Sequence, residues 1–317
     1  MRTITLEEHF ASPAFIEGPG RAAARPGLVE SLLDVGDGRI EEMDAAGVDV
    51  QVLSLAAPGV EQMEAGESVA MARETNDYLA EAVRRHPQRL AGFAALPTPD
   101  PEAAARELDR TVGQLGFLGA VVNGHSRGRY LDDPFFDPIL ERAEALDAPL
   151  YLHPAAPPKA VVDASYGGFS PEVVFALSTS GWGWHIETAV HVLRLIVGGV
   201  FDRHPRLQIL IGHMGEALPF MLPRFDLSMP PELTGIKRPI SAYLRENVHY
   251  TFSGFNWTPN LLDLLLQVGV DRIMFSADHP YRSMAEAVAF LEGAPLSPAD
   301  QERIAHGNAE RLLRLEG

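Results

Sequence analysis

Short apolar or β-branched runs alternate along the chain with longer stretches of helical periodicity. The eight runs are Thr3 to Glu7, Val48 to Leu55, Leu90 to Leu96, Leu118 to Val122, Pro149 to His153, Leu207 to Gly212, Val248 to Phe252 and Arg272 to Ser276. A strand followed by a helix, repeated along the chain, is typical of parallel βα units, and eight such units close into a barrel. The pattern therefore predicts an α/β fold, a (β/α)8 TIM barrel that forms one domain over residues 1–317.

Two stretches fit no βα unit because they are rich in Gly, Pro and Ser. They are Ala11 to Gly38, after the first predicted strand, and Pro154 to Gly183, after the fifth. Loops longer than about 12 to 15 residues are often functional, and both stretches leave the carboxyl end of a strand. We expect both to be long loops that cover the C-terminal mouth of the barrel.

The composition is that of a folded protein, with 46% hydrophobic and 22% charged residues. Lys and Arg number 26 against 43 Asp and Glu, which gives a formal net charge of −17 at pH 7. Such a field repels phosphate backbones and anionic lipids, so we expect neither nucleic acid nor a membrane as a partner. An anionic substrate would need a local cation to offset this repulsion.

Cysteine is absent, which excludes disulfides, thiolate metal ligands and thiol nucleophiles. A bound metal must therefore use His and carboxylate ligands. The sequence starts MRTITLEEHF, without the apolar stretch of a secretion signal, so we expect a cytoplasmic protein. No apolar run of the sequence approaches the roughly 20 residues that a membrane helix needs.

Side chains that can bind a metal fall at the same end of several predicted strands. Glu7 and His9 come at the end of the first, His153 ends the fifth, His213 follows the sixth and Asp278 follows the eighth. The C-terminal strand ends of a barrel converge on one mouth, so these residues are expected to become neighbours. Alternate residues of a strand face the same side, so Glu7 and His9 can both point inward.

Imidazole and carboxylate groups are the ligands that a divalent cation takes when thiolates are absent. Glu7, His9, His153 and Asp278 would supply four ligands to one Mn²⁺, Zn²⁺ or Mg²⁺ ion. Each residue taken singly can instead be a satisfied polar residue at a strand end. Their convergence in a barrel favours the metal site.

His213 and Glu216 lie three residues apart at the expected start of a helix and can share a face. A carboxylate that bonds an imidazole raises its basicity and fixes its orientation, as a general base requires. Alternatively, Glu216 complements the helix dipole and His213 is solvated. Arg224 could supply the local cation for an anionic substrate, or it could pair with Asp226.

The remaining candidates carry weaker signals. Phe10 stands near the expected mouth and could wall a substrate pocket, although simple packing is the alternative. His185 and His191 are six residues apart near a helix start and are poorly placed to share one face. His249 lies near the start of a strand, at the end of the barrel opposite the expected chemistry.

Five motifs follow one another at barrel spacing along nearly the whole chain. They are Leu6-Glu-Glu-His-Phe10, Tyr151-Leu-His-Pro154, Ile211-Gly-His-Met-Gly-Glu216, Phe275-Ser-Ala-Asp278 and His306-Gly-Asn-Ala-Glu-Arg311. Together they resemble the amidohydrolase-related decarboxylases, the family of the γ-resorcylate, 2,3-dihydroxybenzoate and aminocarboxymuconate semialdehyde decarboxylases. The Glu-x-His opening is similar to that of the hydroxybenzoate enzymes, whereas the semialdehyde enzymes and the hydrolases begin with His-x-His.

The resemblance implies one divalent metal on Glu7, His9, His153 and Asp278, and a homodimer or homotetramer. It also implies an acid/base pair of His213 with Glu216 and a substrate contact by Arg224. The fourth predicted strand is followed by Asn123 and has no Lys to bridge two metals, which favours a single ion.

We therefore expect a metal-dependent, non-oxidative decarboxylase of a phenolic, hydroxybenzoate-like acid, a carboxy-lyase that releases CO2. Asp278 is the expected donor of a proton to the ring carbon that bears the carboxylate. His213, oriented by Glu216, would manage the phenol proton. Two alternatives stay open: a metal-dependent hydrolase of a lactone or amide, and a barrel that binds a small acidic ligand without turnover.

Overall fold

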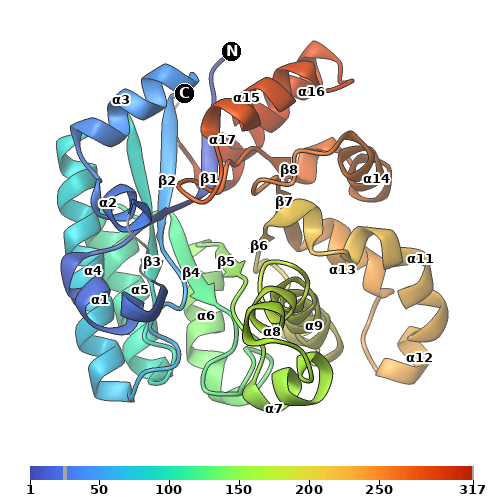
Figure 1. The fold of residues 1–317 in the computed structure, drawn as a ribbon. Helices are drawn as coiled ribbons and strands as arrows, with labels where there is room; N and C mark the ends of the chain where they lie inside the picture. The colour runs from blue at the N-terminus through green and yellow to red at the C-terminus, as the bar shows by residue number, and fades with distance from the viewer. Residues whose placement is uncertain (24–26, 316–317) are drawn as a thin grey trace.

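The computed structural model, which describes residues 1–23 and 27–315, is an eight-stranded parallel barrel wrapped by helices (Figure 1). The strands are β1 (Ile4–Phe10), β2 (Val50–Leu55), β3 (Leu90–Ala95), β4 (Gly119–Asn123), β5 (Leu150–His153), β6 (Ile209–Ile211), β7 (Val248–Thr251) and β8 (Ile273–Met274). Each strand pairs with the next in sequence order. The Leu6 amide donates to the Phe275 carbonyl at 3.1 Å, which brings β1 against the segment that follows β8. The predicted TIM barrel is confirmed.

Helices connect successive strands, and Arg2 near the start of the chain pairs with Glu310 near its end at 3.2 Å. The main connecting helices are α3 (Asp37–Ala46), α4 (Ala65–Arg85), α5 (Pro101–Leu115), α6 (Asp137–Leu146), α9 (Gly183–Val197), α11 (Leu218–Ser228), α13 (Ile240–Glu246), α14 (Thr258–Val268) and α15 (Met284–Gly293). The shorter ones are α1 (Pro13–Glu17), α2 (Leu28–Leu33), α7 (Lys159–Val161), α8 (Pro171–Ser178), α10 (Val200–Arg203), α12 (Pro231–Thr234), α16 (Pro298–Glu302) and α17 (Asn308–Leu313). Within the described residues, none of these helices combines the length and apolar character that crossing a bilayer requires.

The two Gly- and Pro-rich stretches are not simple loops, which corrects the expectation for both. The first holds α1 and α2, apart from residues 24–26, which lie outside the described residues, and the second holds α7 and α8. Ser12 caps α1 by accepting the Phe15 amide at 3.2 Å, and Pro13 is the first residue of the helix. Ser170 and Pro171 start α8 in the same Ser-Pro order. Ser-Pro pairs pre-organise helix starts, so these prolines mark short helices rather than unstructured chain.

A β-bulge in β1 decides which residues enter the barrel. Ile4 and Leu6 belong to the cluster inside the barrel, so strict alternation would turn Glu8 inward as well. The pairing with β2 instead shifts between Leu6 and Glu8, and Glu7 at the shift has a left-handed φ of 68°. The extra residue changes the phase of the strand. Glu7 and His9 consequently reach the interior of the barrel, while Glu8 turns away.

Candidate metal centre and its proton array

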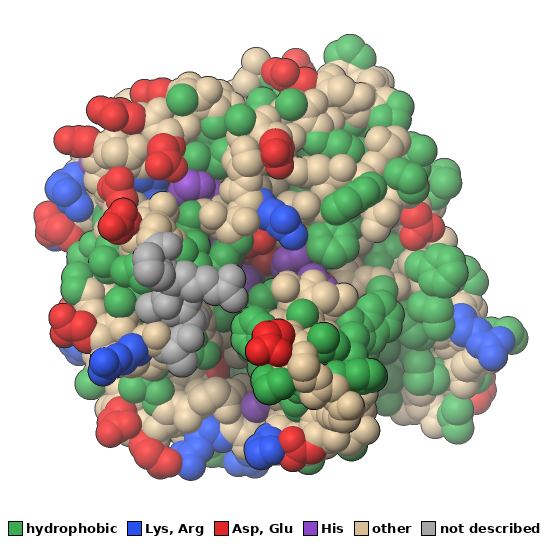
Figure 2. Space-filling model, in the orientation of Figure 1, with side chains coloured by type: hydrophobic (Ala, Val, Ile, Leu, Met, Phe, Trp, Pro, Cys, Tyr) green, Lys and Arg blue, Asp and Glu red, His purple; other side chains and the backbone are tan. Residues whose placement is uncertain are grey.

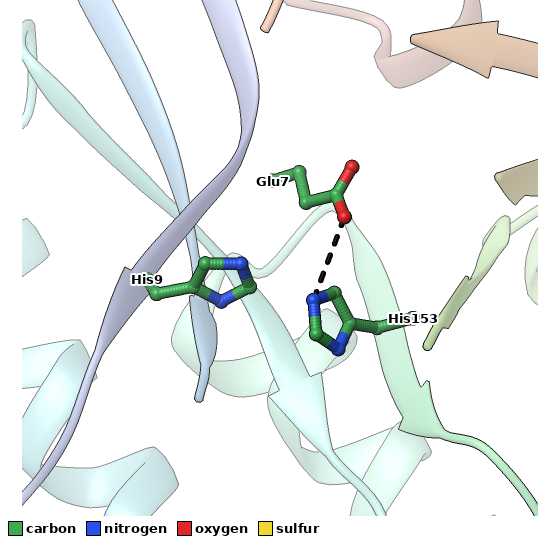
Figure 3. A group of neighbouring side chains, drawn as sticks. All are labelled: Glu7, His9 and His153. Carbon is green, nitrogen blue, oxygen red and sulfur yellow. Dashed lines mark ion pairs between the residues drawn. The ribbon is translucent and has the colours of Figure 1, made fainter. Parts of the chain in front are cut away.

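Three predicted metal ligands converge inside the barrel (Figure 3). Glu7 and His9 come from β1 and His153 from the end of β5, and all three are buried. Glu7 Oε1 lies 3.5 Å from His153 Nε2, and the rings of His9 and His153 are 4.6 Å apart between centroids. Glu7 thus sits within β1 rather than at its end, because the strand runs three residues further than the sequence pattern predicted.

The hydrogen bonds around this group leave its inward atoms unpartnered. Glu7 Oε2 accepts hydrogen bonds from the hydroxyls of Tyr151, Thr251 and Ser253. Glu7 Oε1 and His9 Nε2, by contrast, are buried without a hydrogen-bond partner among the described residues. A buried polar atom normally has a partner, so these two orphans are the expected mark of a site built for an ion.

His153 is oriented by a neighbouring strand. Its Nδ1 lies 2.9 Å from Oδ1 of Asn123, which ends β4, and a carbonyl oxygen can only accept. The proton of a neutral His153 is therefore on Nδ1, and Nε2 is left with its lone pair facing Glu7. Burial, followed by the charges of His9 and His213, holds the pKa of His153 well below its usual range. The imidazole is neutral, as a metal ligand must be.

Asp278, the fourth predicted ligand, is brought to the same place. Its Oδ1 lies 3.3 Å from His9 Nε2. The segment that carries it is held by Glu8, whose two carboxylate oxygens accept the Ala277 amide at 2.8 Å and the His279 amide at 3.1 Å. Burial raises the pKa of Glu8 to about 7, against the opposing effect of these two backbone bonds. Glu8 points away from the site and anchors the backbone on both sides of Asp278.

A second buried group lies beside the first. Glu216 accepts from His213 Nδ1 at 2.7 Å through Oε1 and from His185 Nδ1 at 2.5 Å through Oε2. We call His185, Glu216 and His213 the proton array. His213 Nδ1 is 3.9 Å from Glu7 Oε1, so the proton array adjoins the metal ligands. The predicted contact between His213 and Glu216 is present.

The backbone that forms this contact is not the helix that the spacing suggested. His213 (φ 51°) and Glu216 (φ 54°) both adopt left-handed conformations in a tight turn after β6. A Cβ at Gly212 would lie 2.2 Å from Glu7 Oε2, so only glycine lets this turn approach the metal ligands. Non-glycine residues with positive φ are uncommon, and Glu7 and Asp278 share the feature. Left-handed backbone here gathers at the candidate site.

The proton array is an ion pair in charge as well as geometry. Burial opposes the charged form of His213, but the Glu216 and Glu7 carboxylates overcome it and raise the pKa of His213 to about 10. Burial likewise opposes ionisation of Glu216, yet His213 and His185 hold the pKa of Glu216 below its usual range. A protonated imidazole at the metal centre's edge is therefore available at neutral pH.

Two predicted substrate contacts lie elsewhere. Phe10 is buried in the layer between strands and helices, where its ring stacks on Tyr78 of α4 at a centroid distance of 6.4 Å. The structure gives Phe10 a packing role on the side of β1 away from the metal ligands. Arg224 is exposed on α11, and it contacts none of the candidate site residues in the described part of the chain.

Sequence reasoning missed several residues that shape the site. His185 was set aside because its spacing from His191 fits no shared face, yet its true partner is Glu216, 31 residues away. Only the contact across the fold could reveal this. The inward orientation of Tyr151 and Thr251 could have been predicted from the sequence. Each lies two residues from another inward-facing side chain of its strand, and residues two apart in a strand face the same side.

Figure 2 shows histidine and acidic side chains inside a hollow in the middle of the viewed face, with hydrophobic side chains around it.

Comparisons with known proteins identify the family of this chain. The family described as Amidohydrolase matches residues 33–315. A γ-resorcylate decarboxylase of Rhizobium radiobacter is 40% identical, over 99% of this chain and 98% of its own length. The crystal structure of a 2,6-dihydroxybenzoate decarboxylase from Rhizobium has a TM-score of 0.91, with 40% identity and full coverage of both chains.

A third comparison concerns the ion. A dihydroxybenzoic acid decarboxylase from Polaromonas, 39% identical over 99% of this chain and 97% of its own, has a TM-score of 0.90 and was crystallised with manganese and the inhibitor 2-nitroresorcinol. The predicted resemblance is therefore confirmed. The chain belongs to the amidohydrolase family, and the relatives named here are decarboxylases.

Proposed function

We propose that this protein is a metal-dependent, non-oxidative decarboxylase of a phenolic acid related to dihydroxybenzoate. The observation that carries the proposal is the buried convergence of Glu7, His9 and His153 with two unpartnered atoms. The proton array beside them adds an acid/base group. Relatives of about 40% identity that act on resorcylate and dihydroxybenzoate supply the substrate class.

Glu7, His9, His153 and Asp278 are the residues that we propose hold one divalent cation, with manganese favoured by the Polaromonas relative. A cation held there would supply a Lewis acid that binds and orients the anionic substrate and offsets its charge. Tyr151 and its neighbouring hydroxyls fix one oxygen of Glu7, which keeps the other aimed at the site.

The chain's own residues carry the proton chemistry. A proton from the Asp278 carboxyl forms the new C–H bond at the ring carbon that bears the substrate carboxylate. The bond between that carbon and the carboxylate then breaks, its electron pair restores the aromatic ring, and CO2 leaves. His213, held by Glu216, donates a hydrogen bond to the negative charge that develops on the ring oxygen.

The test is CO2 release from a panel of hydroxybenzoates, with the corresponding phenol measured as the second product. We expect release by the manganese-loaded enzyme, and a loss of at least about a hundredfold in Asp278→Asn. Unchanged activity of Asp278→Asn would remove Asp278 from the mechanism. Incorporation of oxygen from labelled water into the product would identify a hydrolase instead.

Arg224 and Phe10 remain predicted substrate contacts. Arg224→Gln should raise KM for the phenolic acid if its guanidinium meets the substrate carboxylate, and Phe10→Leu should raise KM if the ring walls the pocket. An effect of Phe10→Leu on stability alone would assign it to the packing that Tyr78 indicates.

We also propose a cytoplasmic homodimer or homotetramer that binds neither nucleic acid nor membranes. The net charge of −17 supports the last part. Large apolar side chains are exposed on α11, where Phe220 is 75% and Leu227 73% accessible, and on the adjacent α14, where Leu266 is 86% accessible. Exposed apolar patches favour association. Light scattering in solution measures the assembly directly.

A further inference from the structure

A second cavity lies at the opposite end of the barrel from the metal ligands. It has a volume of about 510 Å³ and is lined by residues at the amino ends of β5 to β8 and by α17. The polar side chains that line it include Arg206, Gln208, His249, Arg272, Arg311 and Arg314. Four guanidinium groups around one cavity are unexpected in a chain with a net charge of −17.

The acidic residues of the cavity do not balance these guanidiniums. Asp147 pairs with Arg314 at 2.6 Å and lies 3.8 Å from Arg206. Arg272 and Arg311, however, have no carboxylate within ion-pair distance in the described ranges of the chain. Asp271, the other acid of the lining, directs its carboxylate to Arg303 at 3.8 Å.

Arg272 and Arg311 are tied to neutral groups instead. Arg272 Nη1 donates to Gln208 Oε1 at 3.1 Å, and Arg311 Nη2 donates to the Asp271 carbonyl at 2.8 Å and to Asn308 Oδ1 at 2.9 Å. Burial and the nearby Arg311 lower the pKa of Arg272. Two guanidiniums are therefore held at the cavity without a carboxylate within ion-pair distance on the described residues.

His249 in the cavity lining adds an independent observation. It is 4% exposed, and in the β6–β7 pairing it stands opposite Leu210, a member of the cluster inside the barrel. His249 Nε2 lies 3.0 Å from Arg272 Nη1, which can only donate, and 3.1 Å from Gln208 Oε1, which can only accept. The other ring nitrogen, Nδ1, is buried and has no partner in the described structure.

Two guanidiniums that lack an ion-pair partner, beside a buried imidazole nitrogen that lacks a hydrogen-bond partner, favour a ligand with negative charge and several oxygens. We propose that this cavity binds a small multivalent oxyanion of the phosphate type, through Arg272 and Arg311 with His249 at its inner wall. Guanidinium groups match phosphate oxygens through paired N–H donors. A planar monocarboxylate would use fewer of the donors present.

The cavity is separate from the metal centre. His249 is the second residue of β7, whereas Thr251, which contacts Glu7, is its last. The two sites thus occupy opposite ends of one strand. An anion at the cavity and a phenolic acid at the metal ligands can be bound together, which gives the proposal a test that does not depend on the reaction.

The experiment is calorimetric titration of the manganese-loaded protein with inorganic phosphate in a phosphate-free buffer. We expect one phosphate per chain, with the same affinity in the presence of a saturating phenolic acid. Arg311→Gln should weaken binding by about tenfold, because a charged hydrogen bond is lost. Arg106→Gln, which changes an exposed arginine outside the cavity, should leave the affinity unaltered.

Arg272→Gln is a second variant with the same expected loss, and Arg314→Gln at the rim is a third, in case removal of the more buried Arg272 disturbs folding. Absence of phosphate binding by the unmodified protein would overturn the proposal. Competition between phosphate and the phenolic acid would do the same, since it would place phosphate at the metal centre. An equal loss in Arg106→Gln would reduce the effect to overall charge.

Discussion

The metal ligands and the proton array are neighbours built from the same residue types, yet their hydrogen bonding differs. In the proton array, both carboxylate oxygens of Glu216 accept an imidazole N–H. In the metal ligands, Glu7 Oε1 and His9 Nε2 have no partner among the described residues. Residue type therefore does not decide which cluster is a cation site. The difference lies in whether the polar atoms already satisfy one another.

The charges differ in the same direction. The proton array already holds a positive imidazole against its carboxylate, because Glu216 and Glu7 raise the pKa of His213 to about 10. The candidate metal ligands hold a neutral His153 beside Glu7, and burial raises the pKa of Glu7. An additional cation would be repelled by the charged imidazole of the proton array, whereas His153 among the candidate metal ligands carries no positive charge. One cluster is thus suited to move a proton and the other to hold an ion.

The largest effect is expected from removing a metal ligand. Glu7→Gln keeps the volume of the side chain but replaces its charge with a neutral amide, so manganese affinity should fall by more than about a hundredfold. CO2 release should fall with it. Metal content after dialysis, measured by elemental analysis, and the rate with added manganese are the two measurements. Retention of manganese by Glu7→Gln would show that the unpartnered atoms are not a cation site.

Chelation of the unmodified protein should have the same consequence without a mutation. Removal of the ion leaves buried carboxylates close together, so both activity and thermal stability should fall, and added manganese should restore them. Activity that survives complete removal of metal would contradict the assignment of Glu7 and its neighbours as a cation site that the reaction needs.

A smaller loss is expected when the proton array is broken. Glu216→Gln leaves His213 without its principal carboxylate, so the pKa of His213 should fall and its charge at neutral pH should be lost. We expect kcat to fall by about a hundredfold with manganese content unchanged. Parallel elemental analysis of Glu7→Gln and Glu216→Gln separates the two clusters. Loss of metal in Glu216→Gln would mean that they form one site.

The sequence predicted the barrel and the convergence of the candidate metal ligands for a common physical reason. Parallel strands bring their carboxyl ends together, so residues such as His153 and Asp278 could be placed at one mouth without knowledge of side-chain contacts. The position of Glu7 was harder to predict, because it depends on a bulge that strict alternation does not contain. The left-handed turn at His213 was not predicted either, because the spacing of the residues suggested the start of a helix.

The role of His185 could not be predicted from the sequence. Its contact with Glu216 depends on how α9 packs over the turn after β6, and helical spacing within α9 carries no information about that packing. The Gly- and Pro-rich stretches failed for the opposite reason. Their composition was interpreted as loop, although Ser-Pro pairs also start helices.

His185 tests how far the proton array extends. His185→Asn removes one of the two imidazoles that bond to Glu216, so the Glu216 carboxylate is held less firmly beside His213. We expect kcat to fall by about tenfold, with a shifted pH profile and unchanged metal content. The matched control is His191→Asn in the same helix. His191 is 2% exposed and accepts the Leu131 amide at 3.0 Å, away from Glu216. Equal kinetic effects of the two variants would make His185 a packing residue only.

Glu61 has the smallest expected effect on the reaction. It shows that an unpartnered buried oxygen does not always mark a cation site. Its Oε2 is buried without a partner in the described structure, whereas Oε1 accepts the Asn123 amide at 2.7 Å. Glu61 belongs to neither of the groups of described residues that could hold a metal ion. Burial raises the pKa of Glu61 to about 8. A proton, rather than an ion, satisfies this carboxyl at neutral pH.

The sign of the resulting pH dependence follows from this shift. The folded state keeps the proton up to about pH 8, whereas the unfolded chain loses it near the ordinary pKa of 4.5. Stability is therefore full below pH 4.5 and declines as the pH rises toward 8. The decline from this group is about 1.4 kcal/mol per pH unit. Glu61→Gln cannot ionise, so its free energy of unfolding should gain steadily on that of the unmodified protein between pH 5 and pH 8 in denaturant titrations. Glu67 is exposed, so the free energy of unfolding of Glu67→Gln should change with pH in parallel with that of the unmodified protein. If the difference between Glu61→Gln and the unmodified protein were also independent of pH, Glu61 would be ionised in the folded state, and its unpartnered oxygen, like that of Glu7, would need a cation.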